Sequence, residues 1–174
     1  MTVIESKKIL TLVFALKPEQ KKILLGMKKR GFGKDKFNGF GGKVEPGETI
    51  LAAAHRELEE EAMIKAENME KMGVNLFTFE EDPIGLEVHV YRFFNFSGQP
   101  TETEEMRPEW FDYKDIPYEQ MWTDDKYWLQ HLLNDQFFLG EYHFAKDQKT
   151  ILYEKLLVTQ EAPIEFDLTK QTAK

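Results

Sequence analysis

Runs of apolar residues along the chain predict a series of β-strands separated by short polar turns. The first two runs, residues 8–16 and 22–27, are rich in β-favouring side chains and flank a turn at residues 17–20, which predicts a hairpin. The same pattern predicts later strands at residues 40–44, 74–80, 86–96, 110–111, 142–145 and 150–158. A turn at Asp82-Pro83 separates the strands at 74–80 and 86–96.

Two segments without Gly or Pro carry a helical pattern. In residues 50–63, Ile50, Ala54 and Leu58 recur at four-residue spacing and form a stripe that can be buried. Thr49 is placed to cap this helix, and residues 126–134 form a second predicted helix. Strands in mixed order with two helices predict an α/β sandwich with helices on both faces of mixed sheets.

The length of the chain suits one domain. A chain of 174 residues buries about 70% of its unfolded surface without disulfides or metals. No repeat or long linker divides it, so we predict a single domain over residues 1–158. Residues 159–174 have weak periodicity and many charges, and we expect them to form a loosely held tail.

Composition narrows the class of protein. The absence of cysteine excludes disulfides and thiolate metal sites. A formal net charge of −8 argues against nucleic-acid binding, and short apolar runs interrupted by early lysines argue against a signal peptide or membrane span. We expect a cytoplasmic monomer, with a mitochondrial or nuclear location also compatible.

One stretch of the chain is basic, although the chain as a whole is acidic. Residues 28–43 contain a single acid, Asp35, and six basic side chains: Lys28, Lys29, Arg30, Lys34, Lys36 and Lys43. This stretch could attract a small polyanion, although a solubilising hairpin edge would have the same composition. Six of the eleven glycines lie within residues 31–47, so the backbone here can approach a ligand closely.

The first predicted helix carries a cluster of acidic side chains. Glu57, Glu60 and Glu61 stand at i, i+3 and i+4, so they project from one patch and repel one another. Hard oxygen ligands of this kind suit Mg²⁺ or Mn²⁺ together with substrate phosphates. The alternative is a solvated acidic face that is partly neutralised by Arg56 pairing with Glu60.

The spacing around this cluster supports the metal interpretation. Gly42, Glu48, Arg56-Glu57-Leu58 and Glu60-Glu61 resemble the Nudix hydrolase signature G-x5-E-x7-R-E-U-x-E-E-x-G-U, where U is aliphatic. The second signature glycine is replaced by Met63. Because this glycine would end the helix in a left-handed conformation, we expect Met63 to continue the helix or to end it without a glycine-type cap.

The resemblance implies a Nudix-fold α/β/α sandwich with mixed β-sheets, and a Mg²⁺-dependent hydrolase for which Mn²⁺ is a second possible ion. It implies that the metal is held by Glu57, Glu60, Glu61, Glu105 and Gly41. Glu61 or Glu105 is then the candidate general base. Arg56 is expected to orient a glutamate and Glu48 to close the loop onto the helix.

Further segments are similar to the branch of this family that hydrolyses oxidised purine nucleoside triphosphates. They are residues 24–33, 37–44 and 105–108, with the residues around Trp122, and the similarity covers about residues 8–156. Phe37 and Thr123 depart from the branch, which usually has Trp and Pro there. The similarity implies a substrate site formed by Asn38, Trp122, Asp124, Asp125, Phe32, Thr11, Lys28, Phe77 and Phe79.

These residue types suit a purine, and each has a structural alternative. Trp122 can stack on a base, Asn38 can both donate and accept, and the adjacent Asp124 and Asp125 could share one proton and so do the same. Equally, aromatic side chains often belong to the core, an aspartate often caps a helix, and Asn38 before Gly39 is a common turn residue.

The function implied by the resemblance is Mg²⁺-dependent hydrolysis of modified purine nucleoside triphosphates, such as 8-oxo-dGTP and 2-hydroxy-dATP, to the monophosphate and pyrophosphate. Such an enzyme would sanitise the nucleotide pool and prevent DNA damage. One alternative is a Nudix hydrolase of a nucleotide sugar, a dinucleoside polyphosphate or capped RNA. The other is a non-catalytic nucleotide-binding module, although no signature glutamate is missing.

Overall fold

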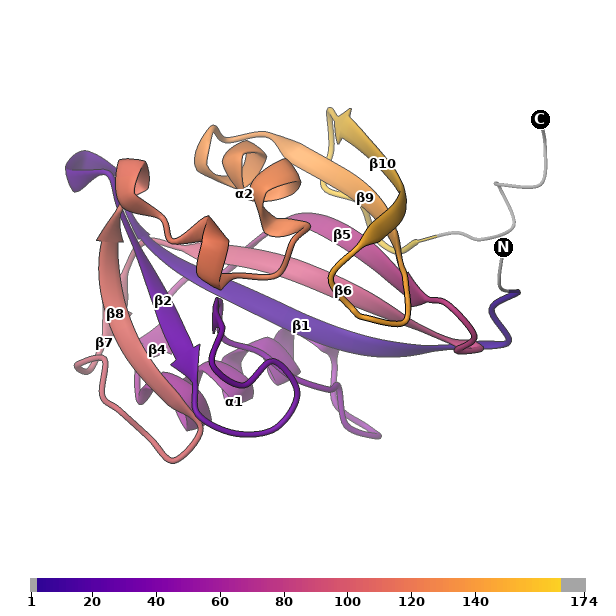
Figure 1. Ribbon diagram of the computed structural model, residues 1–174. Helices are drawn as coiled ribbons and strands as arrows, with labels where there is room; N and C mark the ends of the chain where they lie inside the picture. The colour runs from indigo at the N-terminus through magenta and orange to yellow at the C-terminus, as the bar shows by residue number, and fades with distance from the viewer. Residues whose placement is uncertain (1–2, 167–174) are drawn as a thin grey trace.

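The computed structural model describes residues 3–166. Three short 3-10 turns lie at Pro18–Gln20, Tyr113–Asp115 and Tyr118–Gln120. The helices and strands, labelled in Figure 1, are β1 (Ser6–Lys17), β2 (Lys22–Lys28), β3 (Phe37–Asn38), α1 (Ile50–Ala62), β4 (Lys65–Ala66), β5 (Glu70–Phe79), β6 (Ile84–Phe93), β7 (Phe96–Ser97), β8 (Met106–Asp112), α2 (Asp125–Leu133), β9 (Phe137–Phe144) and β10 (Ile151–Thr159).

The strands of the described region form one large mixed sheet of eight strands and a small two-stranded sheet. The large sheet runs in the order β10-β9-β5-β6-β1-β2-β3, and β8 pairs with β2. β1 pairs in parallel with β6 and β5 in parallel with β9, whereas the other pairs in this sheet are antiparallel. β4 and β7 form the small sheet.

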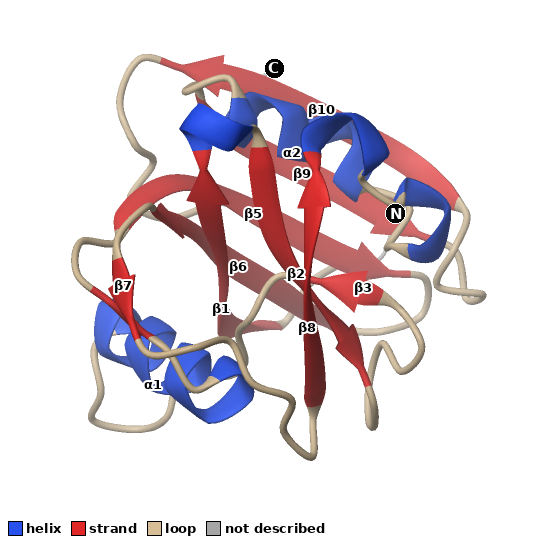
Figure 2. Ribbon diagram, turned by 90° about the vertical axis from the view of Figure 1, so that its left-hand side faces the viewer, coloured by secondary structure: helices blue, strands red, loops and turns tan. Residues whose placement is uncertain are grey.

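The two helices cover opposite faces of the sheet, as Figures 1 and 2 show. Strand alternation explains the two cores, because neighbouring residues of β1 point to different faces. Phe14 and the other β1 residues on its face pack with α2 residues such as Trp128, whereas Val13 packs with Ala54 and Leu58 of α1. The α/β/α architecture predicted from the sequence is therefore confirmed.

Most predicted strands are present, and their ends differ from the predicted bounds, some longer and some shorter. The expected strand at residues 40–44 is wrong, because the regular pairing in this loop lies at β3. Phe40 and Lys43 make only isolated bridges to Val13 and Leu10 of β1. A Cβ on Gly41 would lie 1.8 Å from the carbonyl oxygen of Thr11, so the loop approaches β1 too closely for a regular strand with side chains.

The two ends of α1 follow different rules. At the N-terminus, the Thr49 side chain accepts a hydrogen bond from the Ala52 amide at 3.1 Å, as expected. At the C-terminus, Met63 has φ 59° and ψ 31°, and its amide donates to the Glu59 carbonyl. The expectation that Met63 would continue the helix is therefore wrong, because Met63 adopts the left-handed conformation that glycine favours.

The C-terminal segment packs against the α1 face of the sheet. Phe166 is buried against Val74 and Leu76 of β5. The side-chain ammonium groups of Lys7 and Lys71 donate to the carbonyls of Phe166 and Ile164. The expected tail of residues 159–174 thus begins at the last residue of β10 and is attached to the sheet at Ile164 and Phe166, while residues 167–174 lie outside the described part.

Met63→Gly should stabilise the fold. The Met63 side chain is exposed, so its removal costs little packing, whereas a left-handed residue with a Cβ costs roughly 1–2 kcal/mol. After the entropy that glycine adds to the unfolded chain, we expect a net gain of about 0.5–1 kcal/mol. Denaturant unfolding checks this, with Met63→Ala as the control that keeps the Cβ. A Gly variant no more stable than the Ala variant would contradict the prediction.

Candidate active site

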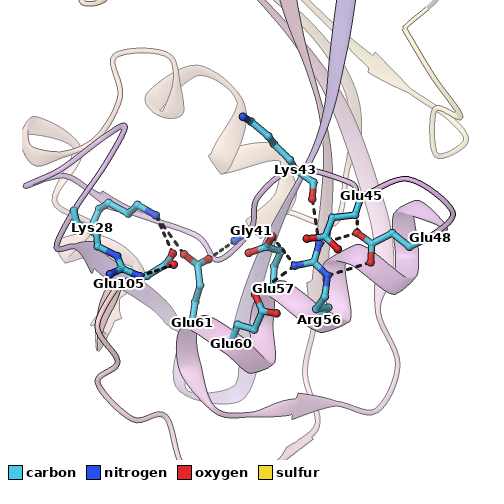
Figure 3. Close-up of polar contacts among 11 residues, drawn as sticks. Lys28, Gly41, Lys43, Glu45, Glu48, Arg56, Glu57, Glu60, Glu61 and Glu105 are labelled. Atoms are coloured by element: carbon cyan, nitrogen blue, oxygen red, sulfur yellow. Dashed lines mark hydrogen bonds and ion pairs between the residues drawn. The ribbon is translucent and has the colours of Figure 1, made fainter.

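Arg56 joins the glycine-rich loop to helix α1 (Figure 3). Its guanidinium donates to both carboxylate oxygens of Glu48, at 3.1 and 2.7 Å, and to Glu57 at 2.9 Å and Glu60 at 3.3 Å. The hydrogen bond from Arg56 is the main cause that lowers the pKa of Glu48 to about 2. Arg56 therefore links three glutamates, and its contacts with Glu48 connect the loop to the helix.

Glu61 is the buried carboxylate of this group. One of its oxygens accepts a hydrogen bond from the Gly41 amide at 2.7 Å, and the other lies 3.5 Å from the Lys28 ammonium. Lys28 also lies 3.4 Å from Glu105, which accepts from Arg30 at 3.2 Å. Burial raises the pKa of Glu61 to about 7, whereas the hydrogen bond from Arg30 lowers the pKa of Glu105.

The carboxylates contact basic groups and do not converge on one point. Within residues 3–166, no three acidic or histidine side chains are arranged to surround a metal ion. Their chemistry nevertheless fits a divalent cation, because oxygen is the ligand that such ions prefer. Burial raises the pKa of Glu57 as well as that of Glu61, and a bound cation would stabilise the ionised form of both. Glu57, Glu60, Glu61 and Glu105 are the residues that could hold it.

A cavity of about 730 Å³ extends from Glu61 across the α2 face of the sheet. Its walls include all nine residues expected at the substrate site and, besides Glu61, two of those expected at the metal site. They are Thr11, Lys28, Phe32, Asn38, Gly41, Phe77, Phe79, Glu105, Trp122, Asp124 and Asp125. Arg56, Glu57 and Glu60 do not line this cavity, so the structure divides the expected site into a cavity and an adjoining carboxylate cluster on α1.

Aromatic side chains form the outer wall of the cavity. Phe32, which is 60% exposed, packs on Trp122 with ring centroids 4.9 Å apart. The Lys36 ammonium lies 5.3 Å from the Trp122 ring, and a Cβ on Gly33 would approach the indole to 3.3 Å. Phe32 and Trp122 therefore present aromatic surface at the entrance and do not belong to the buried core.

Phe77, Phe79 and Asn38 make structural contacts and also line the cavity. Phe77 stacks on Tyr142 and Phe79 on Phe144, so both belong partly to the core while they line the cavity. The side-chain oxygen of Asn38 accepts from the Gly39 amide at 2.8 Å, which is the expected turn contact. Each of these residues thus makes the structural contact that was its alternative explanation, and each also lines the cavity.

Asp124 and Asp125 are buried together at the inner end of the cavity. Neither aspartate caps α2, because the Asp124 side chain makes no capping hydrogen bond and instead accepts from the Trp128 indole at 2.7 Å. One oxygen of Asp125 is buried without a hydrogen-bond partner. Burial raises the pKa of both carboxyls, and the charge of Asp124 raises that of Asp125 further, so the environment of the pair favours a protonated carboxyl.

Sequence reasoning did not assign the residue that holds Asp124. Trp128 is fully buried in the α2 core and donates to Asp124 from the next turn of the helix. The spacing of four residues places the two side chains on one face of a helix, and this signal could have identified the pair.

The model of the NUDIX domain matches residues 7–132 of the chain. The chain belongs to the NUDIX family. Members of this family generally use a divalent metal ion, which agrees with the oxygen donors on α1.

Two curated NUDIX relatives are similar over most of the chain. The oxidized purine nucleoside triphosphate hydrolase of Danio rerio is 48% identical over 139 residues, which are 80% of this chain and 88% of that protein. The protein of the same name from Mus musculus is 46% identical over 147 residues, which are 84% of this chain and 92% of that protein.

Solved NUDIX structures share the fold. A crystal structure of a MutT protein from Bacillus halodurans superposes with a TM-score of 0.74 at 27% identity, covering 86% of this chain and 97% of that one. The NUDIX domain of Shewanella oneidensis NrtR, crystallised with ADP ribose, gives a TM-score of 0.60 at 12% identity, over 78% and 89% of the two chains.

No helix within residues 3–166 has the length and apolar character needed to cross a membrane.

Asp125→Asn should make this NUDIX domain more stable at neutral pH. A carboxyl whose pKa is raised by folding binds its proton more tightly in the folded state, so it costs stability as pH rises from the unfolded pKa through the folded pKa. Asparagine has no such cost. We expect the stability advantage of the variant over the parent to grow as pH rises from 4 to 8, because the parent carboxyl must then ionise in a buried position.

Denaturant unfolding across this pH range measures the difference. The exposed Asp115→Asn change serves as the control and should give a difference that is independent of pH. A constant difference for Asp125→Asn as well would show that the pair is not destabilised by ionisation.

Proposed function

We propose that this NUDIX hydrolase converts oxidised or otherwise modified purine nucleoside triphosphates to the monophosphate and pyrophosphate, with Mg²⁺ as its ion and Mn²⁺ as a possible substitute. The single observation that carries the proposal is the cavity. It joins a buried hydrogen-bonding pair, Asp124 and Asp125, to the buried carboxylate Glu61. The names of the two curated relatives support the same substrate class.

The inner end of the cavity has the groups needed to recognise a purine. Trp122 and Phe32 offer aromatic faces for stacking, which contributes about 1–3 kcal/mol per base. The Asn38 amide and the Asp pair offer donors and acceptors from different walls. Because the shared proton lets the pair donate and accept, purines with different hydrogen-bonding edges can be accommodated.

The other end of the cavity has the groups needed for hydrolysis. A bound Mg²⁺ would polarise the phosphoryl oxygens and lower the pKa of the attacking water. In our proposal water adds to phosphorus, and the bond between the monophosphate and pyrophosphate breaks. Glu61, whose pKa is raised to about 7, is better suited than Glu105 to accept the water proton. Lys28, which contacts both carboxylates, supplies a positive charge beside the phosphates.

Two rival functions predict different residues. A NUDIX hydrolase for nucleotide sugars, dinucleoside polyphosphates or capped RNA would share α1 but would not need the buried Asp pair in the same cavity. A non-catalytic module would tolerate the loss of a signature glutamate, and none is lost in this chain. The purine triphosphate proposal accounts for both ends of the cavity.

A substrate panel tests the proposal. With Mg²⁺, modified purine triphosphates such as 8-oxo-dGTP and 2-hydroxy-dATP should be hydrolysed faster than pyrimidine triphosphates. A pyrimidine base is too small to contact both Asn38 and the Asp pair. Asp124→Asn and Asp125→Asn should raise KM and alter the ranking among purines without changing the Mg²⁺ requirement. Equal rates for purines and pyrimidines, or preferential hydrolysis of nucleotide sugars, would contradict the proposed function.

Glu61→Gln should lower kcat by at least a hundredfold at saturating Mg²⁺. The variant keeps the size of the side chain but removes the charge that would bind the cation and accept the proton. Glu59→Gln is the matched control, because Glu59 lies on the same helix, is exposed and pairs with Lys65 away from the cavity. Turnover of the Glu61→Gln enzyme within tenfold of the parent would exclude Glu61 from catalysis.

A further inference from the structure

A row of polar side chains is buried on the α1 face of β1 and β6. Alternation along the strands places Lys7 and Thr11 of β1 and Glu87 and His89 of β6 on the face that carries Val13. Thr11, Glu87 and His89 are each at most 3% exposed. Thr11 also lines the cavity, whereas Lys7, Glu87 and His89 do not, and the proposed hydrolysis leaves these three without a role.

Two atoms in this row lack a hydrogen-bond partner. They are Thr11 Oγ1 and His89 Nδ1, both buried. Thr11 and His89 are directly opposed in the parallel β1–β6 ladder. A hydrogen bond between them would satisfy both atoms, whereas leaving either one unpaired is costly in a protein interior.

The same residue pair recurs on this face of the sheet. Thr78 and His143 are directly opposed in the parallel β5–β9 ladder. There the threonine hydroxyl and His143 Nδ1 are hydrogen-bonded at 2.8 Å. Parallel pairing therefore allows a threonine and a histidine in these positions to make the contact, and Thr78–His143 provides a matched comparison within the molecule.

We propose that Thr11 Oγ1 donates a hydrogen bond to His89 Nδ1, and that the row Lys7–Glu87–His89–Thr11 positions the loop of Gly41 and Gly42 that holds Glu61. Thr11 and His89 are positioning residues in this proposal. They act through the backbone and do not touch the reacting atoms.

The partners of His89 determine which nitrogen carries its proton. Burial would raise the pKa of Glu87, but hydrogen bonds from His89 and Lys7 outweigh it and hold the pKa at about 2. The ionised Glu87 can only accept, so His89 Nε2, 2.9 Å away, is the donor. Lys7, which forms an ion pair with Glu87 and donates to the Phe166 carbonyl, already balances the carboxylate charge. An imidazole that carries its proton at Nε2 leaves Nδ1 free to accept a hydrogen bond.

Thr11 connects this row to the active-site loop. Its amide donates to the Gly42 carbonyl at 2.9 Å, and its own carbonyl lies where a Cβ of Gly41 would be only 1.8 Å away. The Gly41 amide in turn donates to Glu61 at 2.7 Å. Rotation of the Thr11 side chain is restrained by the bond to His89, and the restraint reaches Glu61 through two backbone contacts.

The hydrogen bond is tested by ¹⁵N NMR of the imidazole groups in the full chain. In the parent, His89 should be neutral, protonated at Nε2 and hydrogen-bonded at Nδ1. Thr11→Val should shift the His89 Nδ1 resonance downfield, toward that of a free acceptor, and leave His143 unchanged. Thr78→Val should shift His143 and leave His89 unchanged. A His89 protonated at Nδ1, or one insensitive to Thr11→Val, would overturn the proposal.

The positioning role is tested by kinetics, and this part rests on the proposed function. Thr11→Val should lower kcat on the best purine triphosphate about tenfold with an unchanged purine ranking, because the Asp pair lies on the other face. Thr11→Ser, which keeps the hydroxyl, should recover most of the loss, and Thr78→Val should behave as the parent. Equal losses in the Val and Ser variants would refute positioning by the hydroxyl. A parent that is inactive on purines would refute the proposed function but not the NMR result.

Discussion

The close approach of the glycine loop to β1 is the constraint on which the site depends. A Cβ on Gly41 would lie 1.8 Å from Thr11 O, and a Cβ on Gly42 would lie 2.5 Å from a Glu57 oxygen. A side chain at either position would push the loop away from the strand or from α1. Because Glu61 is held by the Gly41 amide, its place relative to the cavity follows from how closely the backbone packs.

The two ends of the cavity control negative charge by different means. At α1 and the loop before it, neighbouring carboxylates are held close together because Arg56 contacts three of them, so their mutual repulsion is offset by one partly exposed cation. At the base end no cation contacts Asp124 or Asp125 among the interactions of the described residues, and burial instead favours the protonated form of a carboxyl. In the proposed function, the first arrangement would supply anionic ligands for a metal, and the second would supply a neutral donor for a base.

The sequence predicted those features that depend on local order. Thr49, the stripe of Ala54 and Leu58, and the contacts of Arg56 all follow from spacing within one helix and the turn before it. Met63 was wrongly predicted because residue preference disfavours a left-handed methionine, whereas the chain must reverse direction there to reach β4. The fold outweighs the local preference, as is common at helix ends.

Contacts between residues that lie far apart in the chain could not be predicted from the sequence. Nothing in the spacing of Thr11 and His89 shows that they face one another, since parallel strands bring together residues that lie far apart in the chain. The cavity wall was recovered through resemblance to a known family, because periodicity alone could not separate Phe77 and Phe79 from core residues. The ladder register decides which polar residues meet, and only the structure gives it.

The C-terminal segment shows why weak periodicity does not mark the end of a packed domain. Helix α1 has 13 residues and spans about 20 Å, so it covers only part of its face of the sheet. Val74, Leu76 and Leu139 lie on the remaining part, where Phe166 and Ile4 pack over them. One aromatic side chain and two main-chain carbonyls bound by lysines are enough to hold this cover. A segment can therefore complete a core without a repeating apolar pattern, because it needs only one residue at the right position.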